Sequence, residues 1–158
     1  MKNIFKDILK GKVVIVGVGN TLRRDDGFGP ILIEKLGSNN NLVCFDVGTS
    51  PENYMGRIIK EKPGTILIVD CIHLEKQAGD YDILDSSEIV KSGFTTHDLS
   101  PKMFLDYLSL ETKASIYLLG IQPQDVSFGE GMSKELNSTL KEITKLLMEI
   151  KNARDTLN

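Results

Sequence analysis

Short runs of apolar residues alternate along the chain with longer segments in which apolar residues recur at helical spacing. The short runs are rich in β-branched residues and occupy residues 13–18, 42–47, 65–70, 81–84 and 115–121. Most of them are apolar on both faces, which is typical of strands in the middle of a parallel sheet. The pattern therefore predicts five strands, with helices in the segments around them.

Four segments outside the strands are predicted to be helical. Ser50 and Ser100 each precede a proline, and an N-cap residue followed by proline in the first turn starts a helix. In the last segment, apolar residues three and four positions apart form one stripe, which indicates packing against a core. The expected helices span residues 28–36, ended by Gly37, and residues 51–62, 101–110 and 133–151.

The alternation of strands and helices predicts a single three-layer α/β/α sandwich, in which helices flank a twisted, mostly parallel sheet of about five strands. The 158 residues of the chain match the length of one ordinary domain. No repeat or linker divides the sequence, so we expect one domain over residues 1–158. Residues 1–12 are expected to form an N-terminal extension, and residues 152–158 a flexible tail.

The charge of the chain favours neither nucleic acid nor an anionic membrane as a partner. Charged residues make up 26% of the sequence, and the net charge is -3 at pH 7. Charges interrupt the apolar residues of positions 1–12, and no later run reaches membrane-spanning length, so we expect a cytoplasmic protein. We also expect it to be a monomer. Cys44 and Cys71 lie within or just after strand-like runs, which favours buried, reduced thiols.

Acidic residues and one histidine follow the predicted strands, at the edge of the sheet where ligands bind in open α/β folds. Asp25 and Asp26 come after the first strand, Asp46 belongs to the second, Asp70 ends the third, and His97 follows the fourth. Two carboxylates and one imidazole suit nickel, zinc, manganese or iron, and three protein ligands leave a position open for water or substrate. A metal site formed by Asp26, Asp70 and His97 is therefore the preferred interpretation.

Structural roles for the same residues stay open at this point. Asp26 favours the positive end of the helix that follows it, and Asp25 can be the capping residue of that helix. His97 can be a loop histidine bonded to the backbone. Arg23 and Arg24 can be ordinary surface charges.

Other classes of catalytic or binding site fit the sequence poorly. The glycine turn after the first strand lacks the third glycine of a dinucleotide fingerprint, because Leu22 stands in that place. The sequence contains no P-loop motif and no glycine-x-serine-x-glycine elbow. Cys71 follows a strand-ending residue, whereas a reactive thiolate needs an exposed, electropositive position.

Five longer motifs occur in a fixed order along the chain. They are GVGNTLRRDDGFGP, DVGTSPEN, ILIVD, TTHDLSP and LLGIQPQDVSFGEGMS. In this order and at these separations they resemble the hydrogenase maturation endopeptidases, the enzymes that trim the C-terminus of the large subunit of nickel-iron hydrogenases. The resemblance covers residues 13–150. GTSPEN and GIQP are most similar to the branch that serves formate-hydrogenlyase-type and membrane-bound energy-converting hydrogenases.

The resemblance implies an endopeptidase with a five-stranded sheet and with Asp26, Asp70 and His97 as its catalytic and metal-contacting residues. It implies that the metal is nickel, supplied by the precursor substrate and bound by the precursor's own cysteines, although another divalent metal can occupy the site in vitro. The implied partner is the C-terminal region of the large-subunit precursor. Two alternatives are a non-catalytic module that checks the precursor for nickel and a metal-dependent hydrolase of another small substrate.

The loop after Asp70 departs from the pattern of this family. The sequence CIHLEKQAGD replaces the usual small residue, second acid and glycines, so that His73 stands in the place of the acid and no glycine follows until Gly79. We interpret His73 as a solvent-facing substitution. Contact with the substrate or with a metal is the open alternative.

Overall fold

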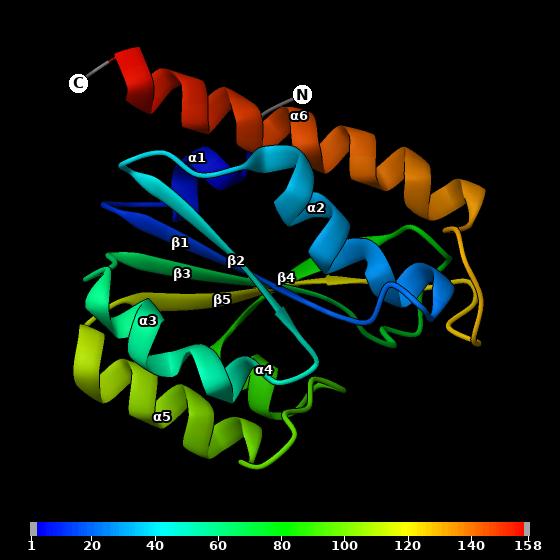
Figure 1. Cartoon of the computed structure of the whole chain (residues 1–158), viewed down its shortest axis with the longest axis horizontal. Coiled ribbons are helices and arrows are strands. Elements are labelled where there is room, and N and C mark those ends of the chain that lie inside the picture. Colours follow the sequence, from blue (N-terminus) through cyan, green and yellow to red (C-terminus); the bar gives the residue numbers. More distant parts are fainter. Residues whose placement is uncertain (1–2, 157–158) are drawn as a thin grey trace.

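The computed structural model describes residues 3–156, and in this range one five-stranded sheet separates two layers of helices (Figure 1). The strand order is β2-β1-β3-β5-β4. All neighbouring strands are parallel except β4, which is antiparallel to β5. The strands are β1 (Val13–Val18), β2 (Leu42–Gly48), β3 (Thr65–Cys71), β4 (Tyr81–Asp85) and β5 (Ser115–Ile121). The predicted strands and the predicted fold class are confirmed.

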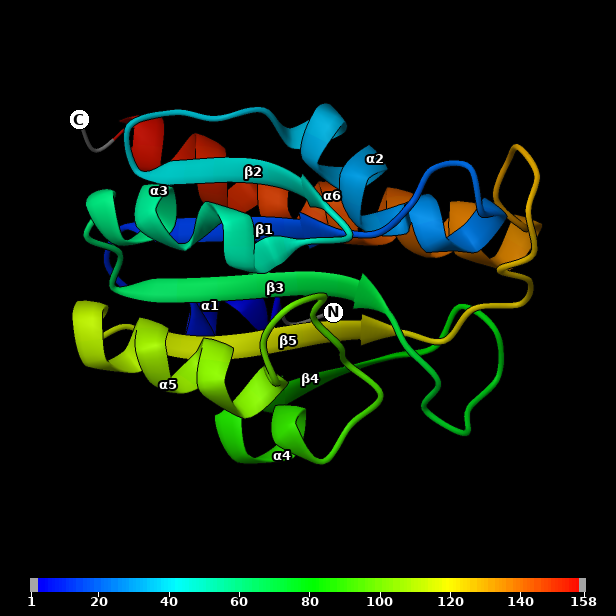
Figure 2. The same ribbon diagram turned by 60° about the horizontal axis from the view of Figure 1, so that its bottom comes forward.

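Helices cover both faces of the sheet, as Figures 1 and 2 show. One face carries α1 (Phe5–Ile8), α2 (Phe28–Leu36) and α6 (Lys134–Thr156). The other face carries α3 (Met55–Lys60), α4 (Ser86–Val90) and α5 (Pro101–Thr112). Two short 3-10 helices, η1 (Arg24–Gly27) and η2 (Pro51–Tyr54), precede α2 and α3. Among the described residues, no helix combines the length and the apolar character needed to cross a bilayer.

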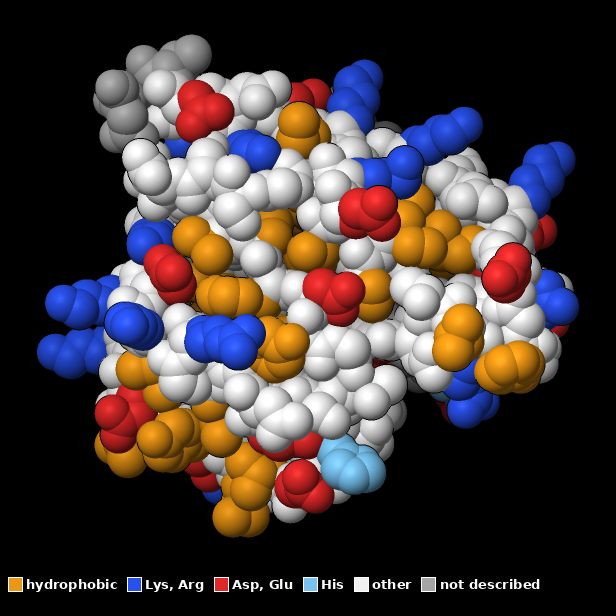
Figure 3. Space-filling view, in the orientation of Figure 1, with side chains coloured by type: hydrophobic (Ala, Val, Ile, Leu, Met, Phe, Trp, Pro, Cys, Tyr) orange, Lys and Arg blue, Asp and Glu red, His pale blue; other side chains and the backbone are white. Residues whose placement is uncertain are grey.

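The hydrophobic core has two layers because successive residues of the central strands point to opposite faces of the sheet. Val13 and Ile15 of β1 pack with α1, α2 and α6, whereas Val14 and Val16 pack with α3, α4 and α5. All four of these side chains are fully buried. Exposed large hydrophobic side chains occur on α5 and on the loop between β5 and α6, and Figure 3 shows further hydrophobic side chains at the surface across the middle of this face.

The helices agree with the predicted ones to different degrees. Helix α2 has its predicted bounds and ends at Gly37, whose φ of 61° lies in the left-handed region that favours glycine. The predicted helix over 51–62 is divided into η2 and α3. Helix α4 was not predicted, although its capping box of Asp85 and Glu88 is visible in the sequence DSSE.

Both terminal segments contain helical structure. Helix α1 lies within residues 1–12, and its Phe5 is fully buried in the core, while Leu9 is nearly so. The side-chain amide of Asn3 donates to the carbonyl oxygen of Leu146 in α6 at 2.9 Å. At the other end, α6 continues to Thr156, so the tail expected over 152–158 is helical as far as that residue. Residues 157 and 158 lie outside the described part of the chain.

Glycines allow the segment after β1 to lie directly on the sheet. A Cβ atom at Gly29, near the start of α2, would lie 2.5 Å from the carbonyl oxygen of Val18 and 2.8 Å from that of Val69. A Cβ atom at Gly17 would lie 2.6 Å from the carbonyl oxygen of Gly29. Because these neighbours are backbone atoms, they cannot rotate away. The two glycines therefore bring η1 close to the carboxyl ends of β1 and β3.

We expect Gly29→Ala to lower the free energy of unfolding by about 3 kcal/mol, since an added methyl group must displace two strands. Gly56→Ala is the matched control, because Gly56 lies in α3 with nothing within 4 Å of an added Cβ. Alanine favours the helix, so this control should be neutral or stabilised by about 1 kcal/mol. Urea unfolding midpoints measure both variants. Equal midpoints for the two variants would contradict the close approach of α2 to the sheet.

Candidate functional site

Asp70 lies one residue before the end of β3 and is 8% exposed. Its pKa is raised well above the ordinary value, first because burial disfavours the charged form and second because the carboxylate of Asp26 repels it. A hydrogen bond from the backbone N–H of Cys71 acts in the opposite direction. A buried carboxyl group at the carboxyl edge of the sheet, next to another carboxylate, is where a cation or a proton is favoured.

Asp26 belongs to η1 and is partly buried. Burial raises its pKa, while a hydrogen bond from the backbone and the positive charge of Arg23 lower it. This bond runs from the backbone N–H of Asn20 to Oδ2 of Asp26, at 2.9 Å. Asp26 lines an open hollow of about 250 Å³ together with Asn20, Arg23, Thr49 and Val126. The carboxylate is therefore accessible from the surface, whereas Asp70 lies deeper.

His97 is held in place through its backbone. The backbone N–H groups of His97 and Asp98 donate to the carboxylate of Glu52, at 3.1 Å and 3.3 Å. Glu52 is a buried residue of η2, so this carboxylate ties the loop before α5 to the end of β2. The imidazole of His97 is itself 72% exposed, with Nε2 4.0 Å from Oδ1 of Asp98. Sequence reasoning missed Glu52, although the GTSPEN motif contains it.

The structure thus brings together two of the three predicted site residues. Asp26 and Asp70 are close enough to raise the pKa of Asp70 by repulsion, whereas the imidazole of His97 faces solvent. Within residues 3–156, no three histidine, cysteine, aspartate or glutamate side chains converge in an arrangement that could hold a metal ion. Two carboxylates with unfavourable mutual repulsion are suited to receiving a cation, and the three-residue metal site stays a prediction.

Asp25 has a structural role that differs from the expected one. Its buried carboxylate accepts hydrogen bonds from the backbone N–H groups of Gln124, Asp125 and Ser133, at 2.8 Å, 3.0 Å and 2.7 Å. The hydroxyl of Ser133 adds a fourth bond at 3.0 Å. The N-terminus of α2 has no side-chain cap. The interpretation of Asp25 as a capping residue of α2 is therefore wrong, and this carboxylate organises the loop between β5 and α6.

The two arginines before Asp25 bind the same loop and are not free surface charges. Arg23 donates through Nε to the carbonyl oxygen of Val126 at 3.0 Å. Arg24 donates through its backbone N–H to the carbonyl oxygen of Gly129 at 3.1 Å, and through Nη1 to that of Glu130 at 3.2 Å. The segment that carries Asp26 and the loop between β5 and α6 are therefore fixed to one another.

Neither cysteine is placed as a nucleophile. Cys71 is buried, and its thiol donates to the carbonyl oxygen of Asp25 at 3.0 Å. Burial and the three nearby carboxylates of Asp25, Asp26 and Asp70 raise the pKa of this thiol. Cys44 is only partly buried, in contrast to the prediction, and burial raises its pKa to about 11. Both residues are free cysteines, as the sequence predicted.

The loop after Asp70 is held by Gln122 of the GIQP motif. Its side-chain oxygen accepts from the backbone N–H of Leu74 at 2.6 Å, and its nitrogen lies 3.3 Å from Nδ1 of His73. His73 is exposed, which agrees with the solvent-facing interpretation. Gln122 thus restrains the conformation of this loop through its side chain.

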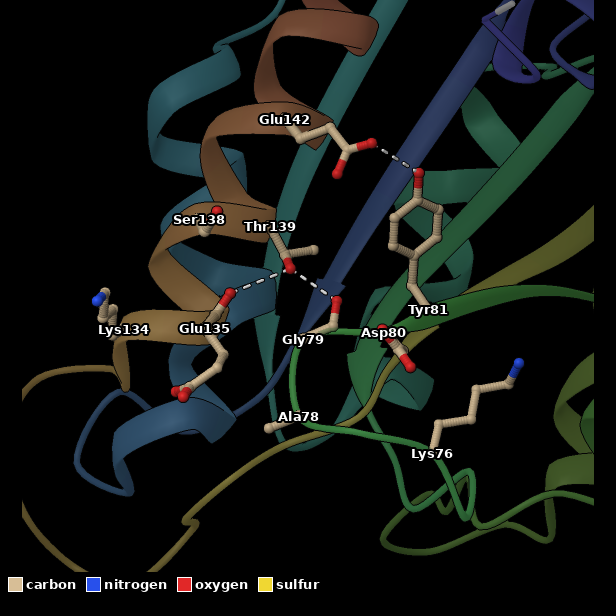
Figure 4. Close-up of a pocket in the computed structure, with 10 residues that line it drawn as sticks. All are labelled: Lys76, Ala78, Gly79, Asp80, Tyr81, Lys134, Glu135, Ser138, Thr139 and Glu142. Atoms are coloured by element: carbon tan, nitrogen blue, oxygen red, sulfur yellow. Dashed lines mark hydrogen bonds between the residues drawn. The ribbon is translucent and has the colours of Figure 1, made fainter. Parts of the chain in front are cut away.

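A larger hollow, of about 630 Å³, lies between residues 76–81 and the first turns of α6 (Figure 4). Two hydroxyl groups in its wall are hydrogen-bonded to other residues of the wall. The hydroxyl of Thr139 donates to the carbonyl oxygen of Gly79 at 2.6 Å, and that of Tyr81 donates to Oε1 of Glu142 at 3.3 Å. None of the three predicted site residues lines this hollow. We therefore place the candidate site at Asp26 and Asp70.

Comparisons with known proteins identify the family and the fold of this chain. The sequence profile of the family described as hydrogenase maturation protease matches residues 31–150. A putative hydrogenase maturation protease of Methanocaldococcus jannaschii is 33% identical, with 95% of each chain covered. The hydrogenase 3 maturation protease of Escherichia coli is 32% identical over 85% of this chain and 87% of its own length.

A solved structure has the same fold. The crystal structure of a [NiFe] hydrogenase maturation protease from Thermococcus kodakarensis superimposes with a TM-score of 0.83 at 28% identity, covering 93% of this chain and 97% of the other. The order of the strands, the acidic residues at the carboxyl edge of the sheet and these similarities lead to one conclusion. The chain belongs to the hydrogenase maturation protease family.

Proposed function

We propose that this protease removes the C-terminal extension of a nickel-iron hydrogenase large-subunit precursor that already carries nickel, with Asp26, Asp70 and His97 as the contacts for the metal. The observation that carries the proposal is the pair of carboxyl groups at the open edge of the sheet, of which Asp70 is buried against its neighbour. A cation delivered there relieves their repulsion. The family names the class of substrate, and the three residues are those that the resemblance of the sequence motifs implies.

The nickel belongs to the substrate in this proposal. Asp26 and Asp70 offer hard oxygen ligands, which bind nickel modestly when they are the only ligands. A precursor that holds the ion through thiolates needs only to complete its coordination when the two proteins meet. The exposed imidazole of His97, on a loop restrained by Glu52, supplies the third contact in this proposal.

In this proposal a water molecule is the nucleophile that attacks the peptide bond, because neither cysteine is available for that role. The thiol of Cys71 is engaged with the carbonyl oxygen of Asp25, and the raised pKa of each cysteine keeps both thiols protonated near neutral pH. Asp26 lines the open hollow and is positioned to orient the scissile peptide or a water molecule beside it. A bound cation would supply polarisation of the peptide carbonyl.

We expect Asp26→Asn and His97→Ala to reduce trimming of the precursor by at least about 100-fold, the scale seen when one essential catalytic group is lost. His73→Ala, which removes the other histidine of the sequence, and Asp106→Asn, on the exposed face of α5, are the matched controls. Mass spectrometry of the large subunit measures trimming, and circular dichroism verifies the fold. Normal trimming by folded Asp26→Asn or His97→Ala would refute the residue assignment.

We expect Asp70→Asn to abolish trimming and at the same time to raise the melting temperature at neutral pH. Folding raises the pKa of Asp70, so ionisation of this carboxyl group lowers the free energy of unfolding. This loss of stability is absent below the ordinary aspartate pKa and complete above the raised pKa of the folded protein. Asparagine removes this penalty. Thermal unfolding in chelator, from neutral pH down to about pH 4, should show the advantage of the variant shrinking. A variant less stable than wild type at neutral pH would contradict the repulsion.

We expect the chelator-treated protease to trim a nickel-loaded precursor and to leave the nickel-free precursor intact. Only the loaded precursor carries a cation that the carboxylates can bind, so the protease has a higher affinity for the loaded than for the nickel-free precursor. Cleavage therefore follows insertion of the metal. Release of the C-terminal peptide is followed for both samples in parallel. Efficient trimming of the nickel-free sample would contradict the requirement for nickel in the precursor. Binding of the loaded sample without any cleavage would instead favour the non-catalytic module.

A further inference from the structure

Three exposed apolar side chains lie on two segments that are bonded to each other beside the candidate site. Leu22 is 53% exposed, Val126 is 36% exposed and Phe128 is 80% exposed. The backbone N–H of Gly129 donates to the carbonyl oxygen of Leu22 at 2.8 Å, which joins the two segments. Figure 3 shows hydrophobic side chains at the surface over the loop between β5 and α6. We name Leu22, Val126 and Phe128 the apolar patch.

Hydrogen bonds hold the segments that carry the apolar patch at several points. The buried carboxylate of Asp25 binds the loop at both ends, through Gln124 and through Ser133. The side chain of Arg23 binds the carbonyl oxygen of Val126 from the opposite segment. A partner that docks on this surface has little backbone to order, so little conformational entropy is lost on binding.

The apolar patch reaches the candidate site through one of its members. Val126 lines the same hollow as Asp26. A chain that reaches Asp26 from the side of this loop therefore passes over the patch. Leu110, which is equally exposed, lies instead at the end of α5, the helix that leads into the start of β5, and so at the opposite edge of the sheet.

We propose that the apolar patch docks an apolar segment of the hydrogenase precursor next to its cleavage site, with Phe128 as the anchoring side chain. This inference rests on the proposed function. Exposed aromatic residues on a preorganised surface contribute a large share of the binding energy in protein interfaces. In this proposal the loop fixes the position of the peptide relative to Asp26. The proposed metal contacts distinguish the nickel-loaded precursor from the nickel-free one.

The test compares Phe128→Ala with Leu110→Ala, since both side chains are 80% exposed and neither change leaves a cavity in the core. Wild type and both variants are titrated with nickel-loaded precursor, and the dissociation constant and the rate of trimming are measured. We expect Phe128→Ala to raise the dissociation constant about tenfold and to slow trimming at low precursor concentration, whereas Leu110→Ala matches wild type.

Each outcome decides the inference. Wild-type affinity in Phe128→Ala, or an equal loss in Leu110→Ala, overturns the docking role and leaves the proposed function intact if wild type trims the precursor. If wild type binds the precursor without trimming it, the proposed function fails, and the affinity of Phe128→Ala still decides the docking role. If wild type does neither, both fail. Self-association that is lost in Phe128→Ala, with precursor affinity unchanged, would assign the patch to a second copy and overturn the inference.

Discussion

The buried carboxylate of Asp25 is the contact on which the arrangement of the site depends. It accepts four hydrogen bonds from a loop that is about a hundred residues away in the sequence. A buried carboxylate is costly unless its lone pairs are satisfied, so the loop between β5 and α6 has one favourable position relative to η1. The hollow at Asp26 and the surface around Phe128 both follow from that position.

Two adjacent aspartates therefore have opposite roles that their chemistry alone does not determine. Asp25 points into the protein and is satisfied by backbone N–H groups. Asp26 points to an open hollow, accepts one backbone bond and faces a second carboxyl group. Asp25 therefore holds the loop between β5 and α6, and Asp26 remains available for a ligand. The close packing permitted by Gly17 and Gly29 sets the height of both above the sheet.

The strands could be predicted from local apolar runs, and the approach of Asp26 to Asp70 could be predicted because each residue follows or ends a strand of the parallel sheet. Apolar runs mark the strands, and the carboxyl ends of parallel strands meet at one edge. The role of Asp25 and that of Glu52 could not be predicted, since each binds backbone groups at least 45 positions away. The orientation of His97 depends on the bond from its loop to Glu52. Helix α1 is too short for a periodic pattern to reveal it.

The position of Cys71 prevents its sulfur from acting as a metal ligand at this edge of the sheet. Sulfur is a strong ligand for nickel only as a thiolate, and this thiol is surrounded by three carboxyl groups and engaged with a carbonyl oxygen. Each of these neighbours opposes loss of the proton. In the proposed function, Asp26 and Asp70 therefore offer oxygen atoms to a thiolate-bound metal, while the thiol of Cys71 stays protonated and does not compete with the thiolates of the precursor.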